Sequence, residues 1–244
     1  MKAKLKKDTY GKEIWEYFKG KESFEIVERE DGYIDIFGGA KKYFSEYRNW
    51  PNHEKKAIKL IRGKVLDVGC GAGRHSLYLQ KKGFDVVGID NSSLAIKVSK
   101  LRGLKKTRVM SITEVGKFKP DSFDTIIMMG NNFGLFGSFK RARLLLRKFY
   151  RITSPNALII AESNNPYKTD NPTHLEYHEF NRRRGRMSGQ LRIRIRFGKY
   201  IGEWFDYLLV SKEEIKQILD TTGWRVKKFI NFKKSFYIAI IEKI

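Results

Sequence analysis

Cysteine is almost absent from the 244-residue sequence, which contains only Cys70. This excludes an intrachain disulfide and a zinc site built from cysteines. No run of about 18 apolar residues occurs that could cross a membrane. The first residues, MKAKLKKDTYGKEIW, also lack the apolar stretch of a signal peptide. These absences predict a soluble, cytoplasmic protein.

Histidine is scarce too, with four residues in the chain. Only His174 and His178 have a spacing that metal ligands use, and they lie in a proline-flanked segment that also contains acidic residues. The sequence therefore predicts no metal site.

Acidic residues are few relative to basic ones, since 27 Asp and Glu stand against 50 Lys and Arg, a net charge of +23. Such an excess favours an anionic partner, and nucleic acid is the commonest one because each cation near a phosphate releases a counterion. The alternative is the charged, solubilising surface of a thermophile.

Short apolar segments alternate with helix-length segments from Lys64 onward. This alternation predicts an α/β fold with a mostly parallel sheet covered by helices on both faces. Strands are expected at 65–69, 85–89, 107–110, 123–129, 157–163, 226–231 and 236–241. Helices are expected at 74–82, 92–101, 139–152 and 211–222, the last with a capping box.

Two segments fall outside this alternation. Residues 1–62 carry aromatic anchors and predict an N-terminal helical cap, with a helix over 41–61 whose aromatic face packs on the domain. Residues 164–206 predict a substrate-recognition insertion with a β-hairpin formed by 191–197 and 200–210. The α/β domain then comprises 63–163 and 207–244.

The segment VLDVGCGAGR (65–74) is a strand that ends in Gly69, Gly71 and Gly73 before a helix. Glycines at the carboxyl end of a parallel strand let a ligand approach the backbone. Asp67 lies within this strand, and Asp90 ends the next one, where a carboxylate can accept hydrogen bonds from two ribose hydroxyls. A NAD-dependent enzyme typically has G-x-G-x-x-G, and here the third glycine comes one residue early, which disfavours a dehydrogenase.

This combination resembles the class I (Rossmann-like) S-adenosylmethionine-dependent methyltransferases. The resemblance implies a seven-stranded, mostly parallel sheet and S-adenosylmethionine as cofactor. The high content of Lys, Glu, Ile and Tyr is typical of a thermophilic archaeal member. The residues expected to bind the cofactor are Asp67, Gly69, Cys70, Gly71, Gly73, Asp90, Asn91, Ser111, Ile112, Met129 and Gly130.

The segment MMGNNFGLFG (128–137) follows the fourth expected strand, at the strand end that faces the methyl group in this family. Asn131, Asn132 and Phe133 resemble the Asn/Asp-Pro-Pro-aromatic motif of nucleobase amino-methyltransferases, without its prolines. They also resemble the Gly-Asn-x-Phe of methyltransferases of small amines such as glycine. We expect these three residues to be catalytic: an amide or carbonyl oxygen would orient the acceptor nitrogen, and Phe133 would stack on a base. Alternatively, the asparagines cap a turn and Phe133 belongs to the core.

The predicted insertion is rich in arginine. In LRIRIRF (191–197), alternation places the arginines on one strand face and the apolar residues on the other. The residues expected to bind substrate are Arg182, Arg183, Arg184, Arg192, Arg194, Arg196 and Trp204. The alternative is a charged edge strand that prevents aggregation.

The sequence thus predicts a methyltransferase that acts on RNA, with the N4 amine of cytosine in ribosomal RNA as the leading acceptor and transfer RNA next. Two alternatives are a small-molecule amine N-methyltransferase and an RNA-binding protein with a vestigial cofactor pocket.

Overall fold

The computed structural model describes residues 8–244. Residues 1–7 of the predicted cap lie outside this part. The chain forms two compact units that interleave along the sequence. The first contains the described residues up to Trp50, Leu66–Ser111 and Arg192–Phe205; the second contains Pro51–Val65, Ile112–Leu191 and Asp206–Ile244.

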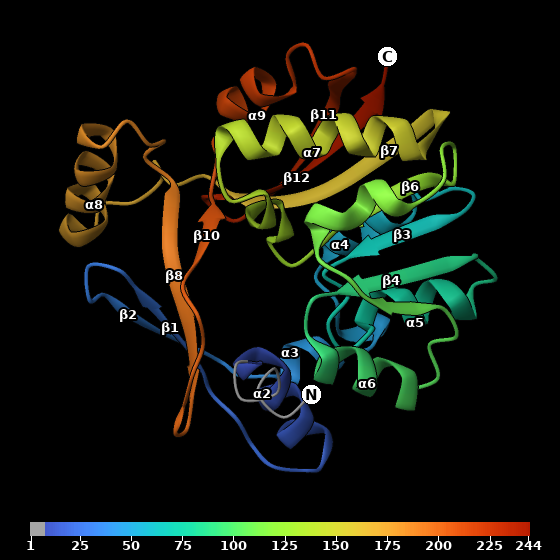
Figure 1. The fold of residues 1–244 in the computed structure, drawn as a ribbon, viewed down its shortest axis with the longest axis horizontal. Helices are drawn as coiled ribbons and strands as arrows, with labels where there is room; N and C mark the ends of the chain where they lie inside the picture. The colour runs from blue at the N-terminus through green and yellow to red at the C-terminus, as the bar shows by residue number, and fades with distance from the viewer. Residues whose placement is uncertain (1–7) are drawn as a thin grey trace. The chain divides into compact units, whose positions relative to one another are not determined.

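The main sheet has seven strands in the order β11-β12-β7-β6-β3-β4-β5 (Figure 1). Their bounds are β3 Val65–Val68, β4 Val86–Asp90, β5 Thr107–Val109, β6 Phe123–Met128, β7 Thr153–Asn164, β11 Trp224–Phe232 and β12 Phe236–Lys243. β4 pairs with β5 and β6 with β7 in parallel, whereas β12 is antiparallel to β7 and to β11. Every residue of β3 and β4 is buried, as expected of strands covered on both faces. The predicted fold class is confirmed.

In the first unit, α5 (Arg74–Lys81) packs on β4, and α6 (Ser93–Leu101) packs on β4 and β5. The N-terminal helix α2 (Thr9–Phe18) packs on α6. Three-residue β5 is followed by the 3-10 helix η2 (Ile112–Lys117), which belongs to the second unit.

In the second unit, α7 (Phe139–Ile152) packs against α9 (Lys212–Leu219), and α4 (Asn52–Ile58) packs on β11 and β12. The predicted helix at 139–152 is therefore confirmed to the residue. The predicted capping box is present as well: Ser211 accepts from the backbone of Glu214, and Glu214 accepts from that of Ser211. A further helix, α8 (Pro172–Arg183), lies within the segment 164–206 expected to be an insertion.

A second, antiparallel sheet has the order β10-β8-β1-β2, with β9 also paired to β8. Its strands are β1 Glu25–Arg29, β2 Ile34–Phe37, β8 Gln190–Phe197, β9 Tyr200–Ile201 and β10 Phe205–Leu208. The predicted hairpin is thus correct, but the prediction of a helical cap over 1–62 is wrong for residues 25–29 and 34–37, which form β1 and β2. β1 and β2 form there because β1 pairs with β8, which lies far away in the sequence.

The predicted helix over 41–61 is also wrong, because Pro51 interrupts it. The segment forms α3 (Lys41–Phe44), the 3-10 helix η1 (Tyr47–Asn49) and, after Pro51, α4. Its aromatic residues still pack on the α/β domain, since Tyr47 stacks on Tyr78 of α5 with ring centroids 4.5 Å apart.

Within the described residues, no helix is long and apolar enough to span a membrane.

Candidate cofactor site and acceptor loop

The loop after β3 has the backbone that its glycines make possible. Gly69, Gly71 and Gly73 have φ of +76°, +52° and +82°, a left-handed region that favours glycine. At Gly71 the space is also restricted, because a Cβ would lie 2.8 Å from the Tyr10 hydroxyl of α2. The loop is thus a backbone cradle that only glycine can form here.

Two buried aspartates flank this loop. Asp67 accepts a hydrogen bond from Ser76 Oγ of α5 at 2.6 Å. Asp90 accepts from the backbone N–H of Gly71 at 2.9 Å and from that of Ser92 at 2.8 Å. Burial raises the pKa of the Asp90 carboxyl to about 6, against the lowering effect of these two bonds. A carboxylate can accept about four hydrogen bonds, so Asp90 retains capacity for ribose hydroxyls.

The helix α2 is fixed next to this site through Asp8. Its Oδ1 accepts from the backbone of Gly11, and its Oδ2 accepts from Ser92 Oγ and from the backbone of Leu94 at the start of α6. One carboxylate therefore caps two helices. Gly11 permits the approach, since a Cβ there would lie 2.1 Å from Ser92 Oγ. The sequence analysis did not find this contact, because nothing local links Asp8 to residues 84 positions later.

The other residues expected to bind the cofactor have varied environments. Cys70 is buried, and burial raises the pKa of its thiol, so it is not a thiolate nucleophile. Ile112 and Met129 are buried, Ser111 is partly buried, and Asn91 and Gly130 are exposed. Their roles stay predictions.

In the second unit, the loop after β6 contains two residues with left-handed backbones, Gly130 (φ +71°) and Asn131 (φ +67°). The Gly130 N–H donates to Glu162 of β7 at 2.9 Å, and the Asn131 carbonyl accepts from the Tyr207 hydroxyl at 2.5 Å. The Asn131 side-chain oxygen, Oδ1, is buried and has no hydrogen-bond partner among the residues described. A buried acceptor without a donor costs about 1–3 kcal/mol, so this atom is suited to a ligand N–H.

The other two residues of the motif begin the 3-10 helix η3 (Asn132–Phe136). Asn132 is partly buried. Phe133 is fully buried and packs edge-on against Phe136 with ring centroids 4.9 Å apart. The prediction that Phe133 stacks on a base is therefore wrong: η3 turns its ring into the core, where no face is open to a ligand.

A cluster that the sequence analysis missed adjoins this loop. His53 and Glu54, in the first turn of α4, lie with Glu162 so that one donor atom of each is within 4.8 Å of the others, and all three are buried. The His53 ring also stacks on Phe232, with centroids 3.6 Å apart. The three residues could exchange a proton or hold a cation. Their proximity comes from tertiary packing, so no spacing in the sequence announces it.

Part of the predicted arginine surface is paired with carboxylates. Arg194 makes two hydrogen bonds to Glu28 of β1, at 2.7 and 2.9 Å, and Arg196 makes a third at 3.2 Å. The Arg194 guanidinium lies 4.5 Å from the Trp204 ring centroid. These two arginines meet a carboxylate because β8 is not an edge strand and Glu28 is the direct cross-strand partner of Arg194. The alternative of a charged edge strand is therefore wrong, and substrate binding by the arginines stays a prediction.

The remaining predicted arginines have other surroundings. Arg182 and Arg183 both pair with Glu179, one turn earlier on α8. Arg184 lies over the ring of Phe180. Arg192 is partly buried in β8.

Comparison with known proteins shows what this chain is similar to. Residues 66–161 match a family model described as a methyltransferase domain. A crystal structure of a SAM-dependent methyltransferase from Bacteroides fragilis in complex with S-adenosyl-L-homocysteine superposes with a TM-score of 0.83 at 26% identity, covering 98% of this chain and 96% of that one.

Two curated relatives match over shorter segments. The chain is 29% identical over 142 residues to a glycine/sarcosine N-methyltransferase of Halorhodospira halochloris, covering 55% of this chain and 53% of that protein. It is 34% identical over 88 residues to a tRNA (uracil(54)-C(5))-methyltransferase of Pyrococcus horikoshii, covering 34% of this chain and 21% of that protein. The matches thus span about half or less of the length of these relatives.

Proposed function

We propose that this chain, whose residues 66–161 match a methyltransferase domain, uses S-adenosylmethionine to methylate a nitrogen of a small amine. The observation that carries this proposal is the unsatisfied Oδ1 of Asn131 in the loop after β6. The cofactor prediction agrees with the bound S-adenosyl-L-homocysteine of the Bacteroides fragilis protein.

The first unit has the groups that fit this cofactor. The glycine backbone after β3 would approach it closely, Asp90 would accept from its ribose, and Asp67 would hold the loop through Ser76. When bound, S-adenosylmethionine supplies a methyl group already activated by the positive sulfur. The protein therefore has to bind and orient the acceptor and remove a proton, and orientation supplies much of the rate.

The second unit has groups for those tasks. Asn131 Oδ1 would accept an N–H of the acceptor, which turns the nitrogen lone pair away from the amide. The backbone bond from Gly130 to Glu162 holds this turn beside the cluster of His53, Glu54 and Glu162. The Glu162 carboxylate or the His53 imidazole can take the proton that the nitrogen gives up.

Several features favour a small acceptor over a nucleobase. Phe133 is buried in the core, and Glu28 pairs with Arg194 and Arg196. The curated relative that matches the longer segment is a methyltransferase of glycine and sarcosine by name.

The proposal is tested with Asn131→Gly, which removes the amide but keeps a residue that tolerates a φ of +67°. The variant should retain its affinity for S-adenosylmethionine, measured by calorimetry, because the change does not touch the glycine loop. A panel of amines, screened for methylated products by mass spectrometry, first identifies a substrate of the wild-type protein. The kcat/KM of the variant on this amine should fall about 5- to 150-fold, which corresponds to the loss of about 1–3 kcal/mol for one hydrogen bond. Methylation of no amine by the wild-type protein, or full activity of the variant, would refute the proposal.

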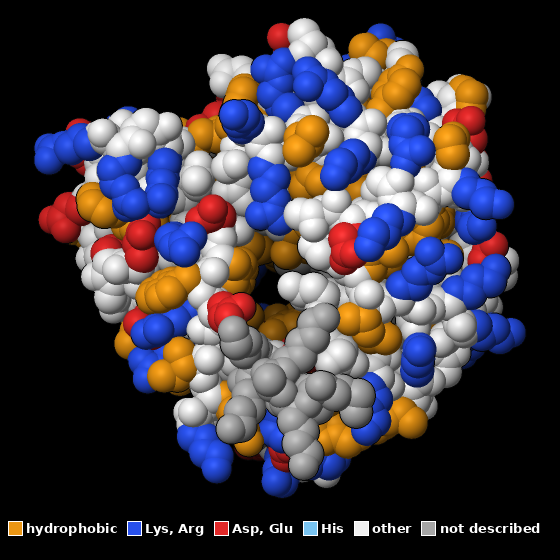
Figure 2. All heavy atoms as spheres, viewed as in Figure 1, with side chains coloured by type: hydrophobic (Ala, Val, Ile, Leu, Met, Phe, Trp, Pro, Cys, Tyr) orange, Lys and Arg blue, Asp and Glu red, His pale blue; other side chains and the backbone are white. Residues whose placement is uncertain are grey.

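A second candidate function is methylation of RNA, including the predicted N4 amine of cytosine. The observation that favours it is the net charge of +23, much of which lies as Lys and Arg on the surface (Figure 2). On α7, for example, Lys140 and Arg147 are exposed. RNA binding through such residues should weaken with salt by a log–log slope of about 0.7 per phosphate contact on single strands. If total RNA incorporates the same amount of methyl label from S-adenosylmethionine with the protein as without it, this candidate function is ruled out.

A pH dependence of cofactor binding follows from Asp90. Its pKa is raised to about 6, first by burial and then by the neighbouring Asp8 and Asp67. The ionised carboxylate accepts ribose hydrogen bonds and the protonated one does so poorly. Affinity for S-adenosylmethionine, measured by calorimetry from pH 5 to 8, should therefore be full above about pH 7 and decrease as the pH falls through about 6. A flat profile would show that Asp90 does not contact the cofactor.

A further inference from the structure

The first unit contains a second group of unsatisfied buried oxygens, on one face of α2. Thr9 and Glu13 are one helical turn apart, so their side chains lie on the same face. Thr9 is 3% and Glu13 0% exposed. Thr9 Oγ1 and Glu13 Oε2 both have no hydrogen-bond partner in the part of the chain described. Burying an oxygen without a hydrogen-bond donor costs free energy. Two such oxygens on one face of a helix indicate that a single ligand could donate to both.

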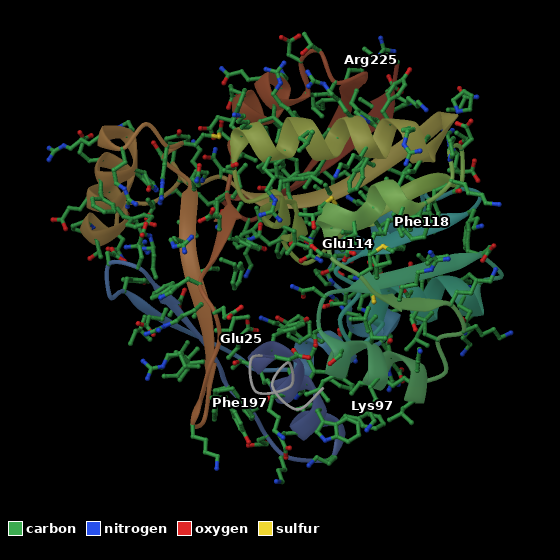
Figure 3. All side chains as sticks on the ribbon, in the orientation of Figure 1. Glu25, Lys97, Glu114, Phe118, Phe197 and Arg225 are labelled. Atoms are coloured by element: carbon green, nitrogen blue, oxygen red, sulfur yellow. The ribbon has the colours of Figure 1, made fainter. Side chains whose placement is uncertain are left out.

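This face of α2 is directed at the small sheet. A Cβ on Gly202, just after β9, would lie 3.4 Å from Thr9 Oγ1, so the backbone comes close to that hydroxyl. Ser23 donates to the other oxygen of Glu13, Oε1, at 3.2 Å. Glu25, at the start of β1 and labelled in Figure 3, is buried. Its charge acts on the Glu13 carboxyl and raises the pKa of that group. Two carboxyl groups and a hydroxyl therefore surround one region of the unit.

The charges in this region are incompletely balanced. Glu25 accepts from the Tyr43 hydroxyl at 2.7 Å and from Lys42 Nζ at 3.0 Å. Among residues 8–244, Glu13 makes no ion pair of this kind. Burial, and after it the charge of Glu25, raise the pKa of Glu13 to about 7, although Ser23 and Lys42 act in the opposite direction. The cluster would thus bind a cation more readily than a neutral or anionic group.

The cluster is also connected to the cofactor loop. The Tyr10 ring packs edge-on against Tyr43 with centroids 5.4 Å apart. Its hydroxyl closely approaches Gly71. Because Tyr43 also donates to Glu25, this aromatic pair connects the cluster with the cofactor loop.

We propose that Thr9 and Glu13 of α2, together with Glu25 of β1, bind a primary ammonium group of the small molecule that the enzyme uses. An ammonium has three N–H donors and a positive charge, which matches two unsatisfied acceptors and a second carboxylate. This inference rests on the proposed function and narrows its substrate class to molecules that carry a primary ammonium group. It assigns a specificity role to a helix that the sequence predicted only as part of a cap.

The inference is tested by calorimetry on the cofactor-free, full-length chain, with 1,4-diaminobutane as the probe and 1,4-butanediol as its neutral isostere. The wild-type protein should bind the diamine and not the diol. Glu13→Gln should weaken diamine binding about tenfold or more, because it removes a charged acceptor. Thr9→Val, which keeps the shape of the side chain, should weaken it by a smaller factor, and the exposed Glu22→Gln should not change it.

Proton release provides a second readout. Glu13 faces Ser23, Glu25, Lys42, Tyr10 and Tyr43. Near pH 6 an ammonium that pairs with Glu13 should displace its proton, so titrations in two buffers of different ionisation enthalpy should show proton release in wild type and not in Glu13→Gln. Thermal unfolding of each variant shows whether weaker diamine binding comes from the loss of the site or from the loss of the fold. If Glu13→Gln does not fold, diamine binding by Thr9→Val tests the inference.

The outcomes distinguish this inference from the proposed function. No binding of the diamine, equal binding of the diol, or unchanged diamine affinity in both variants overturns the inference. If an amine is methylated with the same KM by wild type and Glu13→Gln, the inference fails and the proposed function stands. If diamine binding depends on Glu13 but no amine is methylated, the ammonium site stands and the proposed function fails.

Discussion

Replacement of Glu162 by glutamine is expected to lower kcat for methyl transfer by about 100-fold or more, the contribution of a positioned proton acceptor. Glutamine keeps the shape of the side chain, and its amide oxygen can still accept from the Gly130 N–H that Glu162 holds at 2.9 Å. The change therefore leaves the loop after β6 in place and removes the negative charge of Glu162 from its cluster with His53 and Glu54. Stopped assays of methylated product, run at several pH values, measure the effect.

Glu242 provides a matched control. It lies on β12, where it pairs with Arg225 and Lys227, both exposed on β11. Glu242→Gln should leave kcat unchanged, since this carboxylate serves surface ion pairs that contribute about 0–1 kcal/mol to stability. If Glu162→Gln and Glu242→Gln are equally active, Glu162 only orients the loop. The proton must then leave by another route.

The elements that the sequence predicted best are those with strong local signals. The helix at 139–152 has an apolar stripe that includes Leu145, Leu146 and Phe149, which lie on one face and are buried in the structure. The helix after Ser211 begins with a capping box, a signal contained in four residues. The glycine loop was likewise identifiable, because glycine is required where φ is positive.

The elements that the sequence missed depend on partners far along the chain. β1 is only five residues long, and Glu28 gains its role from Arg194, 166 positions later. Read alone, the alternating arginines of β8 resemble a free cationic face. Once β1 is paired beside β8, the same alternation puts Glu28 directly across from Arg194, where the arginine lowers the pKa of the glutamate. Charge patterns along one strand therefore predict exposure poorly until its neighbours are known.

The residues around the loop after β6 were predicted only in part, again because their positions depend on contacts between distant segments of the chain. The sequence placed Asn131 at the end of β6 correctly, since strand ends carry functional residues in α/β sheets. It could not show that Phe133 turns into the core, or that His53 and Glu54 reach Glu162 across about 108 residues of chain. Both facts depend on how η3 and α4 pack.

Replacement of Asp90 by alanine is expected to have the largest effect on cofactor binding. The carboxylate accepts from the backbone N–H groups of Gly71 and Ser92, so its removal leaves two buried donors unsatisfied and frees the glycine loop. Each unsatisfied donor costs about 1–3 kcal/mol, and the ribose acceptor is lost as well. The affinity for S-adenosylmethionine should therefore fall by about 100-fold or more, with a lower thermal stability.

Two further substitutions separate these causes. Gly71 and Ser92 donate to different oxygens of Asp90, so Asp90→Asn keeps one of the two backbone hydrogen bonds and should lose less stability than Asp90→Ala. It should also weaken cofactor binding by a smaller factor and abolish the dependence on pH near 6, because the amide does not titrate. Asp85→Ala removes an exposed carboxylate that lies just before β4 and pairs with Lys106. It should change neither the thermal stability nor the affinity for S-adenosylmethionine. If Asp90→Asn binds S-adenosylmethionine as tightly as wild type and keeps the pH dependence, the titrating group is not Asp90. The ribose must then be held by backbone groups of the loop.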